Sequence, residues 1–215
     1  MGFVIAVDGP AASGKGTIAG RLAARYGFPF LDTGLLYRAV GVAVLDLGGD
    51  PADPAAAEAA ARRLDLAALD AARLGDRDAG EAASQSAAHR QVREVLRQLQ
   101  RDFAAQEPGA VLDGRDIGTV IAPDAPVKLF VTATPEVRAE RRWRQLVARG
   151  ESLTFEDMLE DIRRRDARDS GRADAPMVMA DDAVLLDTTE MTIEQATDAA
   201  RRIVEAARAR WEQSR

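Results

Sequence analysis

A glycine-rich segment that contains one lysine lies close to the start of the chain, at residues 9–17. Its sequence G-P-A-A-S-G-K-G-T fits the pattern G-x-x-x-x-G-K, in which glycines let the backbone wrap closely around an anion. The N–H groups at the start of a following helix would point at that anion, and Lys15 would add a positive charge for the β- and γ-phosphates. The segment therefore predicts a site for a nucleoside triphosphate. Its candidate binding residues are Gly9, Pro10, Ala11, Ala12, Ser13, Gly14, Lys15, Gly16 and Thr17.

The residues on either side of this segment supply the context that such a loop requires. Residues 3–8 are apolar and β-prone, which predicts a buried strand, and residues 17–26 continue with helical spacing. A glycine-rich turn that only packs a strand against a helix is the alternative, but the lysine in register favours phosphate binding. The first hydroxyl comes at Thr17, after Gly16, and this G-K-G-T variant resembles the loop of nucleoside-monophosphate kinases.

A second group of charged residues follows the apolar segment 110–112. Asp113 ends this predicted strand, where a carboxylate can hold Mg²⁺ directly or through water, and Thr17 is the other candidate metal ligand. A turn-forming aspartate is the alternative for Asp113. Arg115 and Asp116 follow at once, and they could form a structural ion pair. Two ionisable groups at a turn that faces a ligand nevertheless favour a functional site.

Arginines are concentrated in the segment 163–172. Arg165, Arg168 and Arg172 lie three and four residues apart, so one face of a helix would carry all three. Two interpretations stay open at this point. The segment is either a surface helix held by ion pairs at i,i+4 spacing, or a flap that brings positive charge over a transferring phosphoryl group and excludes water.

The predicted order of strands and helices places these groups at one edge of a sheet. Strands are expected at 3–8, 28–31, 110–113, 127–131 and 183–187, and helices at 17–26, 35–47, 53–73, 89–106 and 135–150. Two more helices are expected to begin after Thr154 and Thr192, Thr33 is expected to cap the helix 35–47, and residues 74–83 are expected to form a turn or loop. Alternating strands and helices predict an α/β fold with a five-stranded parallel sheet covered on both faces. Ligands bind at the carboxyl ends of such strands, where the motif-bearing turns fall.

The composition is typical of a single soluble domain. The chain has 215 residues, of which 47% are hydrophobic and 30% are charged. No segment is long and apolar enough to span a membrane, so no membrane partner is expected. The chain has no cysteine, which fits the cytoplasm, and its net charge of −6 argues against a nucleic-acid polymer as its partner.

Five motifs together resemble bacterial cytidylate kinases. They are G-P-A-A-S-G-K-G-T (9–17), L-D-T-G-L-L-Y-R (31–38), D-G-R-D-I-G-T-V (113–120), P-D-A-P-V-K-L-F (123–130) and R-D-A-R-D-S-G-R-A-D-A-P (165–176). The resemblance implies a P-loop kinase core within one domain, 1–215, with a lid at about 150–178 and a nucleotide-binding insert at about 48–90. Segment 64–83 is too short for the small antiparallel sheet that many members carry, so the insert is expected to be shortened.

The resemblance also implies an activity and a role for each site residue. The enzyme would use ATP with Mg²⁺ to phosphorylate CMP or dCMP, as a cytoplasmic monomer. The catalytic residues would be Lys15, Arg115, Arg165 and Arg172. In the CMP site, the acceptor phosphate would be held by Arg38, Arg115 and Arg172, the cytosine by Ser84, Arg93 and Asp116, and the ribose by Arg165 and Asp169. Thr33 and Tyr37 would line the same pocket. From its pattern alone, Arg38 could equally be a solvated helix residue.

Two other classes of protein share the phosphate loop. One is a P-loop kinase for another small molecule, such as UMP or shikimate, and the D-G-R-D sequence with the downstream arginines speaks against shikimate. The other is a nucleotide-dependent switch or regulatory ATPase. The sequence lacks the N-K-x-D motif for guanine and the L-S-G-G-Q motif of ABC dimers, which speaks against this second class.

Overall fold

The computed structural model of the chain describes residues 2–65 and 73–213. Two compact units are present, which we call the core unit and the helical unit. The core unit comprises Met1–Leu31 and Arg101–Arg215, and the helical unit comprises Asp32–Gln100. Within the described residues, no helix is both long and apolar enough to cross a membrane.

A five-stranded sheet forms the centre of the core unit, in the order β2-β3-β1-β4-β5. The strands are β1 (Phe3–Asp8), β2 (Phe30–Asp32), β3 (Gly109–Gly114), β4 (Val127–Thr132) and β5 (Val184–Asp187). β1 pairs in parallel with both β3 and β4, and Asp8 lies opposite Gly114 and Phe130. The turns that follow β1 and β3 therefore leave the same edge of the sheet. This arrangement confirms the predicted parallel sheet.

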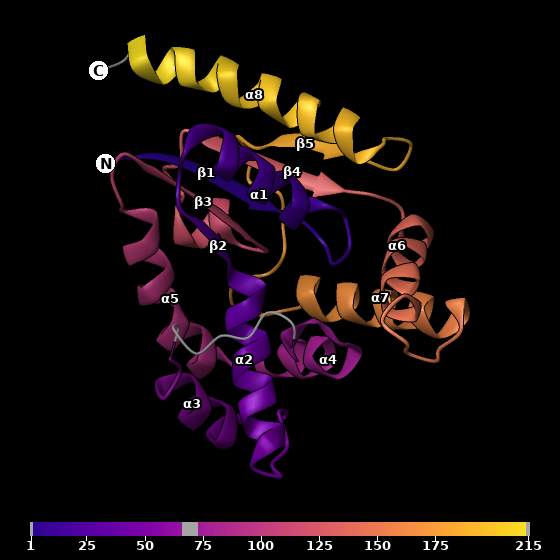
Figure 1. Ribbon diagram of the computed structural model, residues 1–215. Helices are drawn as coiled ribbons and strands as arrows, with labels where there is room; N and C mark the ends of the chain where they lie inside the picture. Colours follow the sequence, from indigo (N-terminus) through magenta and orange to yellow (C-terminus); the bar gives the residue numbers. More distant parts are fainter. Residues whose placement is uncertain (1, 66–72, 214–215) are drawn as a thin grey trace. The chain divides into compact units, whose positions relative to one another are not determined.

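Helices pack on both faces of this sheet (Figure 1). On one face, α1 (Lys15–Tyr26) and α8 (Ile193–Gln213) cover Ile5, Val7 and Leu129. On the other face, Val4, Ala6 and Leu112 pack against the end of α5 (Arg90–Ala104) and a π-helical turn, Ile117–Ile121. The continuous apolar character of β1 follows from burial on both of its faces.

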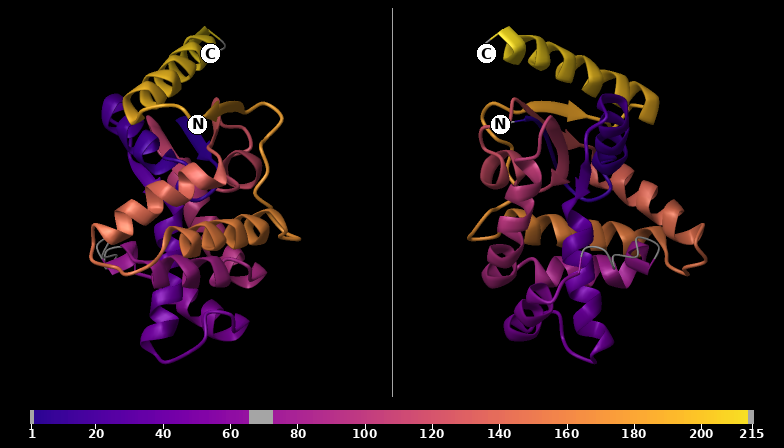
Figure 2. Two further views of the ribbon diagram at one scale, coloured as in Figure 1. Left: turned by 90° about the vertical axis from the view of Figure 1, so that its right-hand side faces the viewer. Right: turned by 60° about the vertical axis from the view of Figure 1, so that its left-hand side comes forward.

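Two further helices of the core unit, α6 (Pro135–Val147) and α7 (Phe155–Ser170), lie side by side (Figure 2). They share an apolar contact formed by Ala139, Leu146, Met158 and Ile162. Thr154 begins α7 with the predicted capping box, in which its hydroxyl accepts from the Asp157 N–H. α7 continues without a break through the arginine-rich segment to Ser170.

The helical unit contains α2 (Thr33–Asp46), α3 (Pro54–Arg62), α4 (Arg77–Ser86) and the first residues of α5. A short 3₁₀ turn, Arg73–Gly75, precedes α4. α2 and α4 approach so closely that a Cβ atom on Gly41 would lie 2.6 Å from the Cβ atom of Ala82. Glycine is therefore required at this helix crossing.

Three local predictions are wrong. The helix expected over 53–73 ends at Arg62, and part of the remaining segment, 66–72, lies outside the described residues. The expected loop at 74–83 is mostly α4, because Asp76 caps this helix by accepting from the Ala79 N–H and its alanines are buried, which offsets the cost of a glycine inside the helix. Asp32, and not Thr33, caps α2, since the Asp32 carboxylate accepts from the Gly34 N–H at 2.8 Å.

Candidate active site

Residues 9–14 of the glycine-rich segment form the loop between β1 and α1, and Lys15, Gly16 and Thr17 are the first residues of α1. Gly9 and Gly14 adopt φ angles of 145° and 91°, which favour glycine. A Cβ atom on Gly9 would lie 2.0 Å from the carbonyl oxygen of Val131, so the loop starts in close contact with β4. Ala12 also has a positive φ, of 60°, which is uncommon for a residue with a side chain. The backbone thus adopts the turn that a phosphate-binding loop needs.

Lys15 and Asp113 join the start of α1 to the end of β3, just before the turn that carries Arg115. Lys15 Nζ lies 3.6 Å from Asp113 Oδ2, and the Asp113 side chain is only 3% exposed. The same carboxylate lies against the start of α1, because a Cβ atom on Gly16 would be 3.2 Å from Asp113 Oδ2. Thr17 is the next residue of α1. The two candidate metal ligands therefore come from adjoining segments.

Carboxylate and hydroxyl oxygens are suitable donors for Mg²⁺, which usually keeps several waters and takes only one or two protein ligands beside substrate phosphates. Asp113 and Thr17 fit this ligand set. Among residues 2–65 and 73–213, no group of three or more His, Cys, Asp or Glu side chains is arranged to hold a metal.

Asp8, at the end of β1, is a buried carboxylate that the sequence analysis missed. It accepts hydrogen bonds from the backbone N–H groups of Ile117 and Gly118, at 2.8 and 2.7 Å. Burial raises the pKa of Asp8 to about 6, although these two hydrogen bonds oppose the change. Asp8 fixes the turn that carries Arg115 and Asp116. Its position after an apolar strand is the same signal that identified Asp113.

Three of the predicted acceptor-site residues meet in the core unit. Asp169 accepts from Arg115 Nε at 2.9 Å and from Arg172 Nη2 at 2.5 Å. Burial by itself raises the pKa of Asp169, but the charges of Arg115, Arg172 and Arg165 outweigh it and hold the pKa below its usual range. Asp169 is thus an ionised carboxylate that anchors two arginines.

The cluster around Asp169 bears on the interpretations left open for Arg115 and for the segment 163–172. Arg115 pairs with Asp169 at 2.9 Å, a partner 54 residues later in the chain. The segment 163–172 is helical and ion-paired, but Arg164 pairs with Asp161 at i,i+3 spacing and not at the expected i,i+4 spacing. On the buried side, Asp169 instead joins α7 to the turn after β3.

Of the remaining acceptor-site candidates, Asp116 and Arg165 belong to the core unit, and the others lie in the helical unit. Thr33 is the buried first residue of α2, and Arg38 on the same helix donates to the carbonyl oxygen of Leu74 at 2.6 Å. Arg93 is buried and donates to the carbonyl oxygens of Ala87 and Ala88, at the end of α4.

Two further candidates complete this set. Ser84, on α4, is buried, and its hydroxyl has no hydrogen-bond partner among the described residues. Tyr37 lies on α2 and is half-buried. These residues belong to a different unit from Arg115, Asp169 and Arg172, and their meeting around one acceptor stays a prediction.

A cavity of about 500 Å³ lies beside the phosphate loop, and the sequence analysis missed it. Its walls are formed by the loop and the start of α1, by α6 and by the segment after β5, including Arg141, Arg142, Thr188 and Met191. Arg141 donates to the carbonyl oxygen and the hydroxyl of Thr188, at 2.7 and 3.0 Å. The adjacent arginines on α6 were the available signal, but arginine is common throughout this chain.

Comparisons with known proteins agree with this geometry. A family model described as cytidylate kinase matches residues 5–206. A cytidylate kinase of Caulobacter vibrioides is 74% identical over 210 residues, which cover 98% of this chain and 99% of that protein. A cytidylate kinase of Xanthobacter autotrophicus is 64% identical over 207 residues, covering 96% of this chain and 99% of that protein. A solved gluconokinase of Sinorhizobium meliloti has a similar fold, with a TM-score of 0.51, 17% identity, and coverage of 100% of this chain and 98% of its own.

Proposed function

The chain belongs to the cytidylate kinase family, whose members are nucleoside-monophosphate kinases, and we propose that it transfers the γ-phosphoryl group of ATP to CMP or dCMP. In this reaction the bond between the γ-phosphorus and the bridging oxygen breaks, and a phosphate oxygen of CMP forms the new bond, giving ADP and CDP. One observation carries the proposal. The end of β3 supplies Asp113 to the phosphate loop, and the turn that follows supplies Arg115 to a cluster of half-buried arginines.

ATP is proposed to bind along the phosphate loop and the cavity beside it. The loop N–H groups and Lys15 would hold the β- and γ-phosphates, and the adenosine would occupy the cavity next to Arg141 and Arg142. Mg²⁺, held by Asp113 and Thr17, would neutralise the charge that develops on these phosphates. The protein residues orient the triphosphate and exclude water from it.

The acceptor phosphate is proposed to bind Arg115, Arg172 and Arg38. This phosphate is already anionic at neutral pH, so it needs positioning more than it needs a general base. Asp169 holds two of the three arginines in place, and its oxygens have further lone pairs that could accept from the ribose hydroxyls, together with Arg165. Arg115 and Arg172 would therefore meet the acceptor already oriented.

The cytosine is proposed to contact Ser84, Arg93 and Asp116, with Thr33 and Tyr37 lining the pocket. The buried hydroxyl of Ser84 supports this assignment, because a ligand would supply its missing hydrogen-bond partner. Arg93 is already oriented by two backbone carbonyls.

Several broader features belong to the same proposal. Residues of about 150–178 would act as a lid, and residues of about 48–90 as a shortened nucleotide-binding insert. The enzyme would act as a monomer in the cytoplasm, where its nucleotide substrates occur.

An acceptor screen tests this function. The purified protein is incubated with ATP, Mg²⁺ and either CMP, dCMP, UMP, AMP or shikimate, and ADP formation is measured. We expect the highest kcat/KM with CMP or dCMP. Faster turnover of AMP or shikimate would overturn the proposed acceptor class. ATP hydrolysis that is unaffected by any acceptor would instead indicate a switch or regulatory ATPase.

A further inference from the structure

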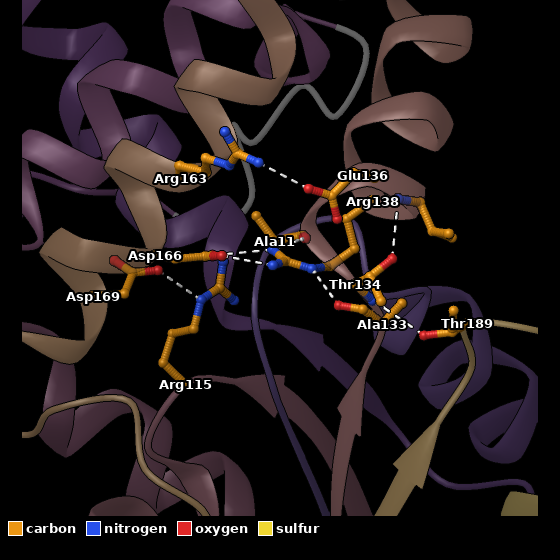
Figure 3. A network of polar contacts seen from close by, with 11 residues as sticks. Ala11, Arg115, Ala133, Thr134, Glu136, Arg138, Arg163, Asp166, Asp169 and Thr189 are labelled. Carbon is orange, nitrogen blue, oxygen red and sulfur yellow. Dashed lines mark hydrogen bonds and ion pairs between the residues drawn. The ribbon is translucent and has the colours of Figure 1, made fainter.

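Arg138, on α6, is a buried arginine whose guanidinium group contacts three separate segments of the core unit (Figure 3). Its Nε donates to the carbonyl oxygen of Ala133 at 2.8 Å, and its Nη1 donates to that of Ala11 at 3.3 Å. Both Nη atoms also donate to the carboxylate of Asp166 on α7, at 3.0 and 2.6 Å. The four bonds occupy four of its five N–H groups, so Arg138 acts on other residues rather than on a substrate.

The contact with Ala11 constrains the phosphate loop. Ala11 precedes Ala12, which has the unusual φ of 60°, and such a conformation persists only where its surroundings hold it. Because a trans peptide is planar, fixing the Ala11 carbonyl toward Arg138 directs the N–H of Ala12 the opposite way. Arg138 thereby sets the orientation of one of the loop's N–H groups.

The contact with Asp166 constrains α7. Asp166 lies one helical turn before Asp169, which accepts from Arg115 and Arg172. Two carboxylates of α7 are thus held one turn apart, one by Arg138 of α6 and the other by Arg115 of the turn after β3. Figure 3 shows both attachments, with Arg138 between Ala11 and Asp166.

We propose that Arg138 is a positioning residue that holds the phosphate loop and the arginine-bearing face of α7 in one arrangement. This inference rests on the proposed function, in which that loop binds ATP and α7 carries groups that bind the acceptor. Through Ala11, Arg138 orders the donor site. Through Asp166, it keeps α7 in the position in which Asp169 presents Arg172.

A second ion pair between the same two helices provides a matched control. Arg163 of α7 donates to Glu136 of α6 at 2.8 Å, but these side chains are 60% and 52% exposed. Exposed pairs of this kind contribute little, because water and salt screen them. If the loss of kinase activity is caused specifically by removing Arg138, breaking the Arg163–Glu136 pair should cause no such loss.

The test compares Arg138→Met, Asp166→Ala and Glu136→Gln in the CMP kinase assay, with folding checked by circular dichroism and thermal melting. Arg138→Met removes the contacts with Ala11 and with Asp166. We therefore expect about a tenfold rise in the KM for ATP and about a tenfold fall in kcat. Asp166→Ala leaves the Ala11 contact intact, so its kcat should fall with an unchanged KM for ATP. Glu136→Gln should match the wild type. The double variant Arg138→Met/Asp166→Ala should be no slower than Arg138→Met alone.

Calorimetric binding of Mg·ATP without an acceptor separates this inference from the proposed function. If the wild type binds ATP but does not phosphorylate CMP, the proposed function fails, and weaker binding by Arg138→Met than by Asp166→Ala still supports the positioning role. Equal ATP affinity in Arg138→Met and Asp166→Ala would overturn the positioning role. The same conclusion would follow if the kinetic constants of both variants matched those of Glu136→Gln. If Arg138→Met does not fold, Arg138→Lys replaces it, because lysine keeps the charge but cannot form the fork. Wild-type kinetics in Arg138→Lys would also contradict the proposal.

Discussion

Lys15 Nζ lies 3.6 Å from Asp113 Oδ2, and this contact links the phosphate loop to the turn that carries Arg115. The contact arises from the parallel pairing of β1 with β3, which brings the two turns to the same edge of the sheet. The proposed carboxylate ligand of Mg²⁺ thus lies at the end of β3, and the loop after the neighbouring β1 leads to Lys15, the proposed cation for the donor phosphates. The two side chains are only 12% and 3% exposed, so solvent screens their attraction weakly.

Lys15→Ala should abolish most turnover without unfolding the chain. Lys15 is proposed to stabilise charge on the β- and γ-phosphates during transfer, and losing such a group lowers kcat by about a hundredfold or more. The rate is measured with CMP and saturating ATP, and folding by circular dichroism. Arg25→Ala, which removes a largely exposed arginine on the same helix, is the control and should keep wild-type turnover. Normal turnover in Lys15→Ala would refute the assignment of the donor site.

Arg172→Ala should lower kcat more than it raises the KM for CMP. In the proposed site, Arg172 stabilises the negative charge on the transferring phosphoryl group, so the loss is greatest in the transition state. We expect a fall of about tenfold to a hundredfold. Arg164→Ala, on the exposed side of α7, should leave kcat unchanged. Equal effects of the two substitutions would favour a purely structural role for the arginines of α7.

Asp8 predicts a specific dependence of stability on pH. Its pKa is raised by burial from 3.8 to about 6, so between these values the folded chain binds a proton that the unfolded chain has released. The free energy of unfolding therefore falls as the pH rises through this range, and the loss is complete above the folded pKa. Asp8→Asn does not titrate. Relative to this variant, the wild type should lose about 3 kcal/mol between acidic and neutral pH.

Urea denaturation at several pH values measures this difference for the wild type and Asp8→Asn. The two curves of unfolding free energy against pH should diverge between about pH 4 and pH 6 and run parallel above this range. Curves that stay parallel throughout would show that Asp8 does not titrate with a raised pKa.

The strands and the caps of α7 and α8 could be predicted from the sequence, because apolar segments and capping residues act locally. α4 could not, since Gly80 and alternating charges conceal a helix that is stabilised by packing on α2. The π-helical turn Ile117–Ile121 was also missed. Its conformation depends on hydrogen bonds to Asp8, which is more than a hundred residues earlier in the chain.

The contrast between local patterns and contacts distant in sequence also applies to the candidate site. Lys15, Asp113 and Arg115 lie in motifs whose spacing reveals them. Arg138 has no such motif, because its partners Ala11 and Asp166 are distant in sequence and one of them contributes only a carbonyl oxygen. The role of Arg138 depends on the packing of α6 against the loop and α7, which no local pattern encodes.

Asp116 is predicted to select cytosine over uracil. Cytosine presents a 4-amino donor where uracil presents a carbonyl oxygen, and an ionised carboxylate can only accept hydrogen bonds. The backbone of Asp116 is fixed, since its carbonyl oxygen accepts from the N–H groups of Val120 and Ile121 at 2.8 and 3.2 Å. With uracil, the Asp116 carboxylate would face the carbonyl oxygen, and two hydrogen-bond acceptors cannot pair. This mismatch would weaken transition-state binding on the order of 1–3 kcal/mol, or about tenfold to a hundredfold in kcat/KM.

Asp116→Asn separates this role from one in which Asp116 only supports its neighbours. The asparagine amide can donate to the uracil oxygen, so the ratio of kcat/KM for CMP to that for UMP should narrow by about tenfold or more. Kinetics with both acceptors at saturating ATP measure this ratio, and Asp124→Asn, in the exposed turn before β4, is the control and should leave the ratio unchanged. If Asp116 supports only the turn, both acceptors weaken together and the ratio stays constant. That outcome would remove Asp116 from base recognition and leave cytosine to Ser84 and Arg93.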